Sequence, residues 1–129
     1  MKSFFVPNLF RSFVVIVNMK VIYNKYFPLK NFTAINLFGL IFARIEYKDL
    51  EKYELNHEKI HTYQIIELLG VLYYLLYAIE WLFRLCQYRD TLKAYHNISF
   101  EREAYTNHFD LGYLKGRRPY SFIHYYRKK

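Results

Sequence analysis

Cysteine is almost absent from this sequence, since Cys86 is the only one among 129 residues. One cysteine cannot form an internal disulfide, and this one lies in an apolar run where a buried thiol is ordinary. The sequence also has no internal repeat and no low-complexity tract. We therefore expect a single folded unit in a reducing, cytoplasmic location.

Acidic residues are scarce beside basic ones, because 11 Asp and Glu stand against 19 Lys and Arg and leave a formal net charge of +8. Such a charge attracts an anionic partner, either nucleic acid or a lipid surface. Helix-turn-helix, zinc-finger, RNP and GXXG patterns are all missing, which argues against nucleic acid. An anionic membrane surface is therefore one expected partner, and a merely solvated basic surface is the alternative. The sequence leaves the oligomeric state open.

The N-terminal region lacks the small-residue cleavage site of a secretory signal, and Pro7 and Arg11 interrupt its apolar stretch. A second methionine, Met19, opens a segment that reads as a natural start. The sequence thus predicts that residues 1–18 are an extension dispensable for the fold. Residues 19–129 then form one domain, because a chain of this length has room for a single core.

Hydrophobic residues make up 53% of the chain and aromatic residues 22%, which excludes disorder. β-branched and aromatic residues are dense in residues 20–23 and 32–45, which predicts two or three short strands. Helical spacing begins near Asp49, a suitable N-cap, and a later helix is predicted from Ser99, as N-cap, to Asp110. The expected fold class is α+β, mainly helical, with a small N-terminal sheet packed beside the helix that follows Asp49.

His57, Glu58 and His61 form an HExxH motif within that predicted helix. Imidazoles four residues apart project from one helical face, so both can reach one zinc ion at about 2.0–2.1 Å. Glu58 lies one position round the helix, where it can take the proton of a metal-activated water. The motif predicts His57 and His61 as metal ligands and Glu58 as the catalytic base. Because HExxH also arises by chance, the alternative is three ordinary helix-surface residues.

A second motif lies downstream, in residues 99–105 (SFEREAY), where Glu101 and Ala104 form an ExxA pattern on a predicted helix. HExxH followed by such a helix resembles the gluzincin metallopeptidases, which include membrane-linked CAAX proteases and antirepressor-type sensor peptidases. The resemblance covers residues 50–110, about half of the chain. It implies a minimal zincin-like domain with Zn²⁺ as cofactor.

The resemblance also assigns roles to single residues. It implies that Glu101 completes the zinc site of His57 and His61, and that the small Ala104 lets the two helices approach closely. Glu103 is the alternative third ligand. The residue after Ala104 departs from the family pattern, because a tyrosine stands where the family usually has an aspartate that braces a ligand.

Several supporting groups stay open at this point. Asp90 and Asp110 are the candidates to replace the missing brace. The residues available to stabilise an oxyanion are His108, Tyr120 and His124. In gluzincins an edge strand beside the motif helix binds extended peptide, and residues 34–45 are expected to contain that strand.

The implied activity is zinc-dependent hydrolysis of a peptide or protein substrate. Two alternatives remain: a non-catalytic membrane-associated or interaction protein, and a degenerate peptidase that binds metal only. The apolar run of residues 65–83 bears on this choice, because its length suits a bilayer crossing although Glu67 and Glu80 interrupt it. A single crossing would place His61 and Glu101 on opposite sides of the membrane, so the zinc site requires a buried helix, an interfacial helix or a bend, for which Gly70 is suited.

Overall fold

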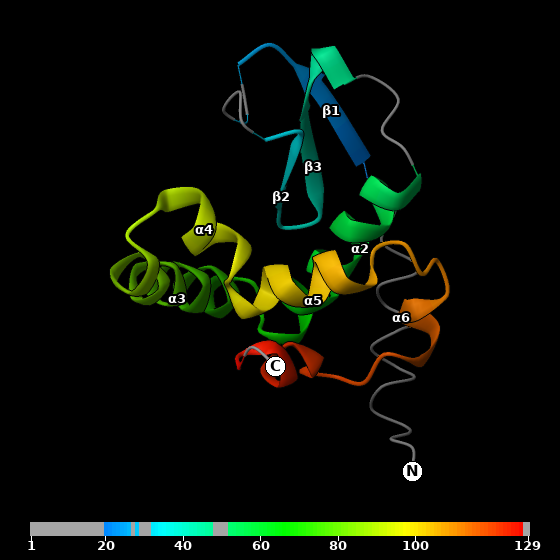
Figure 1. Ribbon diagram of the computed structural model, residues 1–129. Helices are drawn as coiled ribbons and strands as arrows, with labels where there is room; N and C mark the ends of the chain where they lie inside the picture. Colours follow the sequence, from blue (N-terminus) through cyan, green and yellow to red (C-terminus); the bar gives the residue numbers. More distant parts are fainter. Residues whose placement is uncertain (1–19, 27, 29–31, 48–51, 128–129) are drawn as a thin grey trace.

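The computed structural model describes residues 20–26, 28, 32–47 and 52–127. In chain order the elements are β1 (Lys20–Asn24), β2 (Ala34–Leu37), β3 (Leu40–Arg44), η1 (Ile45–Tyr47), α2 (Lys52–Glu67), α3 (Val71–Tyr88), α4 (Thr91–His96), α5 (Ser99–Asn107), α6 (Tyr113–Gly116) and η2 (Ser121–Tyr125). The predicted extension, residues 1–18, and the predicted helix start at Asp49 lie outside the described residues. The α+β class is confirmed, because helices predominate and three short strands form a small mixed sheet (Figure 1).

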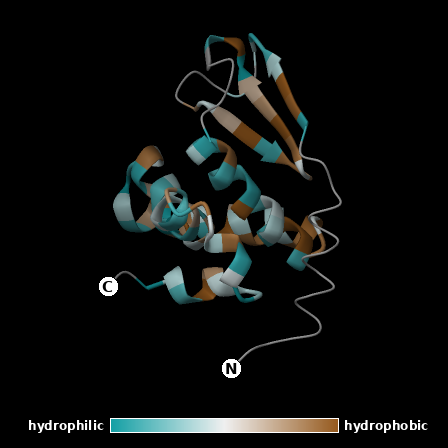
Figure 2. Cartoon of the chain, turned by 90° about the vertical axis from the view of Figure 1, so that its right-hand side faces the viewer, coloured by the Kyte–Doolittle hydropathy of each residue, from teal (hydrophilic) through white to brown (hydrophobic). Residues whose placement is uncertain are grey.

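The sheet has the order β1-β3-β2, with β1 parallel and β2 antiparallel to the central β3. Phe38 and Gly39 close the hairpin between β2 and β3, and both have positive φ (53° and 90°), as a type I′ turn requires. The predicted strands are thus confirmed, and β2 lies at an edge of the sheet. In both views the sheet stands above the helices (Figures 1 and 2), and Figure 2 shows hydrophobic and hydrophilic stretches along its strands.

The buried side chain of Asn36 on β2 links the sheet to α2 by hydrogen bonds. Its amide nitrogen donates to the carbonyl oxygen of Glu58 (2.9 Å) and to the hydroxyl oxygen of Thr62 (2.7 Å). Its Oδ1 accepts from the N–H of Gly39 (2.9 Å), so the same side chain also holds the hairpin turn. The sheet therefore packs beside the helix that carries the motif, as predicted.

A sharp bend separates α2 from α3, and the two helices meet at an angle of 111°. Leu69 and Gly70 both have positive φ, and their N–H groups donate to the carbonyls of Ile66 (3.0 Å) and Ile65 (2.8 Å) respectively. This pair of hydrogen bonds is a Schellman C-cap, which ends α2. The apolar run of residues 65–83 is therefore two helices, with the bend at Gly70. Among the described residues no single helix is long and apolar enough to cross a membrane, and α2 and α3 meet the length and composition criterion only as a bent pair.

The main hydrophobic core lies where α2, α3, α5 and η2 meet. Its buried members are Ile65, Leu68, Tyr73, Ile98, Phe100 and Phe122. The ring of Phe100 contacts those of Tyr73 and Phe122, with centroids 4.7 and 4.4 Å apart. These aromatic contacts hold α5 between α3 and η2, and they place its first turn beside α2.

The predicted role of Ser99 as an N-cap is wrong. Ile98 is the N-cap of α5, and Ser99 is its first residue. The backbone N–H and the hydroxyl of Ser99 both donate to the carboxylate of Glu80 (2.8 and 2.6 Å), so a side chain from α3 replaces the expected serine cap. The helix ends at Asn107 rather than at Asp110.

Two further features differ from the sequence analysis. Cys86, expected in a buried setting, is exposed on α3. The short helix α4 had no counterpart among the predicted elements. Its N-cap is Asp90, whose carboxylate accepts from the N–H of Lys93 (2.9 Å).

Candidate metal centre

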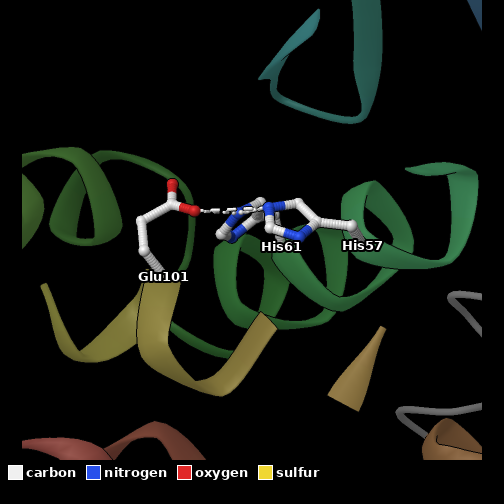
Figure 3. Close-up of side chains that lie close together, drawn as sticks. All are labelled: His57, His61 and Glu101. Carbon is white, nitrogen blue, oxygen red and sulfur yellow. Dashed lines mark hydrogen bonds and ion pairs between the residues drawn. The ribbon is translucent and has the colours of Figure 1, made fainter. Parts of the chain in front are cut away.

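The two histidines of the motif lie on the face of α2 that is turned toward α5 (Figure 3). Because four residues separate them, slightly more than one helical turn, the imidazoles of His57 and His61 share one side, with centroids 4.8 Å apart. Their Nε2 atoms are 3.1 Å apart. Oε1 of Glu101, from the first turn of α5, lies 3.2 Å from Nε2 of His57 and 3.1 Å from that of His61. All three residues are buried.

These three contacts cannot all be hydrogen bonds. An imidazole nitrogen carries at most one proton, and an ionised carboxylate only accepts. If both nitrogens are protonated, their N–H groups face each other. If one is not, its lone pair faces a lone pair of the Glu101 carboxylate. A cation between the three atoms removes this conflict, because all three then act as electron-pair donors to it.

The triangle also has the size of a tetrahedral metal site. Two ligand atoms at about 2.0–2.1 Å from one ion are about 3.3–3.4 Å apart at the tetrahedral angle. The observed separations of 3.1–3.2 Å are close to this value. His57, His61 and Glu101 therefore form a buried group that could hold a metal ion.

Gln64 fixes the orientation of His61. The amide nitrogen of Gln64 donates to the carbonyl oxygen of Phe100 (3.1 Å) and to Glu103 (2.9 Å), so its Oε1 faces the imidazole. Nδ1 of His61 lies 2.8 Å from that Oε1 and donates to it. The Nε2 lone pair is then directed at the cluster, as a metal ligand requires. Gln64 supplies the brace that was expected from an aspartate.

The alternative third ligand, Glu103, points away from the cluster. Its carboxylate accepts from the guanidinium of Arg117 and from the hydroxyl of Tyr113 (2.6 Å). Arg117 also pairs with Glu67, at 2.8 and 3.0 Å. All of Glu103, Arg117 and Glu67 are buried. Of the two glutamates, the geometry therefore selects Glu101 as the one that faces the histidines.

The other two members of the cluster have contacts of their own. Oε2 of Glu101 accepts from the hydroxyl of Tyr77 (2.7 Å), which leaves Oε1 facing the histidines. Nδ1 of His57 lies 3.3 Å from Nδ1 of His108, and the Tyr105 ring packs against the His57 ring at 4.5 Å. Tyr105 thus occupies the place of the missing aspartate as a packing neighbour.

The two aspartates proposed as braces have other roles. Asp90 caps α4, and the carboxylate of Asp110 accepts from the N–H of Gly112 (3.0 Å). The backbone carbonyl of Asp110 accepts from Asn56 (3.1 Å), which also donates to the carbonyl of His108 (2.8 Å). This pair of bonds holds the end of α5 against α2, but neither aspartate side chain contacts a ligand.

Glu58, the predicted base, is buried beside the cluster, and its Oε1 has no hydrogen-bond partner among the described residues. Such an orphaned acceptor is rare in folded proteins and marks a position where another molecule is expected to donate. Burial raises the pKa of Glu58 to about 7, although the nearby His61 opposes the shift. One carboxylate oxygen without a hydrogen-bond partner is therefore present on the helix that carries the two histidines.

The electrostatics of the cluster favour a positive charge at its centre. Burial alone would lower the pKa of His61, but the carboxylate of Glu101 outweighs it and raises this pKa to about 9. Burial likewise disfavours the ionised form of Glu101, yet the two imidazoles hold the pKa of its carboxyl well below the usual value. Burial lowers the pKa of His57. The carboxylate of Glu101 and the two imidazoles thus surround a point that attracts a proton or a cation.

Two clefts reach this centre from either side of Glu58. The larger has a volume of about 660 Å³, and His61, Glu101 and all four residues of β2 line it. The smaller, of about 400 Å³, is lined by His57, Glu58, His108 and aromatic side chains. Residues from α3 and α4 form the opposite wall of the larger cleft, so the edge strand β2 runs along a groove that contains the candidate centre.

The outer edge of β2 has backbone groups that can pair with an added strand. The N–H of Arg44 donates to the carbonyl of Thr33 (3.1 Å). By the alternation of an antiparallel ladder, the backbone N–H and carbonyl of Ile35 then bond to β3, whereas the backbone groups of Ala34 and Asn36 point outward. The outward carbonyl of Asn36 accepts from the hydroxyl of Tyr74 (3.0 Å). Ala34 also lines the larger cleft, so its N–H and carbonyl are available at this edge.

Of the three residues considered for stabilising an oxyanion, only His108 lies near the centre. His108 lies beside His57 and lines the smaller cleft. Tyr120 donates to the backbone carbonyl of Glu67 (3.2 Å), and neither it nor His124 lines either cleft. Tyr95, which the sequence analysis overlooked, lines both clefts. Tyr73 and Tyr77 were overlooked as well, because tyrosines are so frequent in this chain that their spacing gives no signal.

The chain matches no protein-family model, no curated protein and no solved structure. Its interpretation therefore rests on the motif, the geometry of the centre and the chemistry of the clefts.

Proposed function

We propose that this protein is a zinc-dependent peptidase in which His57, His61 and Glu101 hold the metal and Glu58 is the general base. The observation that supports this most strongly is the convergence of the three ligand atoms within 3.1–3.2 Å, from two helices, together with a buried oxygen of Glu58 that has no hydrogen-bond partner among the described residues. Two imidazoles and one carboxylate are a donor set of catalytic zinc sites that keep a fourth position for water. The gluzincin resemblance of the two motifs agrees with this assignment.

Zinc in this position supplies a Lewis acid that polarises a peptide carbonyl and lowers the pKa of water toward 7. Glu58 takes the proton from the attacking water, because its Oε1 is not already engaged in a hydrogen bond. It then donates that proton to the leaving amine as the peptide bond breaks. Gln64 and Tyr77 hold His61 and Glu101 in place, so the ligands need little rearrangement to bind the ion.

The substrate class follows from the groove. An extended peptide adds to the open edge of β2, where the Ala34 backbone provides one donor and one acceptor. Aromatic and apolar side chains of the opposite wall, among them Tyr73, Trp81 and Leu92, line the space for its side chains. We therefore expect peptides with large apolar residues near the cleaved bond to be the better substrates.

Metal content is the first test of the proposal. The purified chain is expected to contain about one zinc ion per molecule by atomic emission, and His61→Ala is expected to lose it, because two ligands remain of three. His124→Ala is the matched control, since that exposed histidine lies on η2 and lines neither cleft. Equal zinc content in His61→Ala and the wild type would remove the metal site from the proposal.

Activity is the second part of the same test. The zinc-loaded chain is expected to hydrolyse members of a peptide library, to lose this activity with a chelator and to regain it when zinc is restored. Stoichiometric zinc with no hydrolysis of any peptide would replace the peptidase with a protein that binds metal only.

A proline at position 34 tests the substrate groove. Ala34→Pro removes an N–H that points away from β3, so the ladder stays intact while one hydrogen bond to an added peptide is lost. We expect kcat/KM for peptides to fall about fivefold, the equivalent of roughly 1 kcal/mol for one hydrogen bond, with the unfolding midpoint nearly unchanged. Ile35→Pro is the control. The N–H of Ile35 pairs with β3, so losing that hydrogen bond is expected to lower the unfolding midpoint. Unchanged kcat/KM in Ala34→Pro would show that peptides do not bind at this edge.

A further inference from the structure

Helix α3 has its apolar side turned outward. Large hydrophobic residues recur along it three and four positions apart, so they share one side of the helix. The exposed ones that make up this apolar face are Leu72, Leu75, Leu76, Ile79, Leu82 and Phe83, between 37% and 56% exposed. An unbroken apolar surface of this kind is rare on a monomeric soluble protein and marks a site of interaction.

The charged residues of the same helix point inward. Glu80 binds the N-terminus of α5 through Ser99, and the guanidinium of Arg84 donates to Glu80 and to the backbone carbonyl of Tyr126 (2.6 Å). Tyr77 and Tyr73 likewise contact the candidate metal centre. Because α3 uses its polar side chains for these internal contacts, no charged residue lies among the exposed positions of the helix.

The apolar surface continues beyond α3. Leu69, at the bend before the helix, is 88% exposed, and Ile123 of η2 is 60% exposed. A hollow of about 390 Å³ connects η2 with the helix, and Ile79, Phe83 and Ile123 line it. The surface is therefore wider than the narrow seam that pairs two helices.

The charge of the molecule complements an anionic surface. Among the described residues nine exposed side chains are basic and three are acidic. Arg89 directly follows α3, Lys93 lies on the next helix, and Arg127 follows Tyr126, whose ring stacks on Phe83 at 6.3 Å. The nearby carboxylate of Asp90 is engaged as the N-cap of α4. Basic groups thus border the end of the apolar face.

We infer that the apolar face of α3 rests in the interface of a membrane that contains anionic lipid. Apolar side chains enter the boundary between headgroups and acyl chains, while Arg89, Lys93 and Arg127 meet the lipid phosphates. A second copy of this chain is a poorer occupant, because each copy carries a net charge of +8 and the exposed side of α3 has no charged residue to fix a register. The inference does not depend on peptidase activity.

Direct partitioning of the whole chain tests this inference. We expect the protein to float with vesicles of phosphatidylcholine and phosphatidylglycerol, and much less with vesicles of phosphatidylcholine alone. Cys86 is the only cysteine and is exposed on α3, so a polarity-sensitive label there reports on this helix without any substitution. Its emission is expected to shift to the blue when the anionic vesicles are added. No flotation and no shift would overturn the inference.

A matched pair of variants identifies the surface that binds. Leu75→Glu/Leu82→Glu is expected to lower the partition coefficient on the order of a hundredfold, about tenfold for each leucine kept out of the lipid. Tyr26→Glu/Thr106→Glu adds the same charge at exposed positions outside α3 and is expected to partition nearly as the wild type. Circular dichroism establishes that both are folded. Equal loss in the two variants would assign the binding to net charge alone. A dimer that only the α3 variant dissociates, without lipid binding, would assign the face to a second copy.

Discussion

Replacing Glu58 by glutamine is expected to lower kcat/KM for peptide hydrolysis by about 10²–10⁴-fold while the zinc content stays that of the wild type. Glutamine keeps the size of the side chain, and the backbone carbonyl at this position still accepts from Asn36, but an amide cannot accept a proton from water. The proposed metal ligands are His57, His61 and Glu101, so removing the carboxylate of Glu58 leaves that donor set intact. Steady-state kinetics together with metal analysis of the same preparation measure both quantities.

Glu54→Gln is the control for this variant. Glu54 lies one turn earlier on α2 and lines the smaller cleft, so its substitution removes a similar charge close to the centre. We expect the control to keep kcat/KM within a few-fold of the wild type. If Glu58→Gln and Glu54→Gln had the same activity, Glu58 would not be the base. If Glu58→Gln lost zinc as well, its carboxylate would belong to the ligand set.

Much of the centre could be predicted from the sequence because its geometry is local. His57 and His61 are separated by one turn of a helix, and no tertiary contact is needed to place them on one side. The choice between Glu101 and Glu103, in contrast, depends on tertiary contacts. Two positions apart, they point to nearly opposite sides of α5, and only the tertiary partner decides which side faces α2.

That partner comes from the tail of the chain, where sequence analysis found only a basic and aromatic composition. Arg117 binds Glu103 and so turns this glutamate away from the histidines. Nothing in the sequence around Arg117 distinguishes it from the exposed basic residues nearby, such as Lys115. Buried ion pairs between distant segments leave no periodic signal, which is why this contact could not be foreseen.

The helices show the same division between local and tertiary causes. Hydropathy is high over most of residues 65–83, so it predicts the presence of helix. Gly70 suggested a bend, but nothing in the sequence indicated that Leu69 adopts a positive φ, which glycine usually supplies. The sequence likewise did not indicate that the apolar side of α3 faces outward. A hydrophobic pattern indicates which residues share a side but does not say whether that side faces a core or the surroundings.

Replacing Arg117 by methionine is expected to lower the free energy of unfolding by about 3–5 kcal/mol. Methionine keeps most of the apolar volume of the side chain, but Glu67 and Glu103 lose the guanidinium that pairs with both of them in a buried setting. Urea denaturation followed by circular dichroism measures the change. Lys115→Met, which removes an exposed positive charge from the same short segment, is the control and is expected to change stability by less than about 0.5 kcal/mol.

The same substitution is expected to weaken zinc binding by about 10–100-fold, the usual effect of losing an outer brace. Arg117 orients Glu103, Glu103 accepts from Gln64, and Gln64 accepts from His61. Three hydrogen bonds therefore connect the tail of the chain to this proposed metal ligand. Competition with a chelating dye measures zinc affinity under conditions where the variant is fully folded. If stability fell and zinc affinity did not, the ion-paired cluster would support the fold alone, and the orientation of His61 would depend on Gln64 without help from the tail.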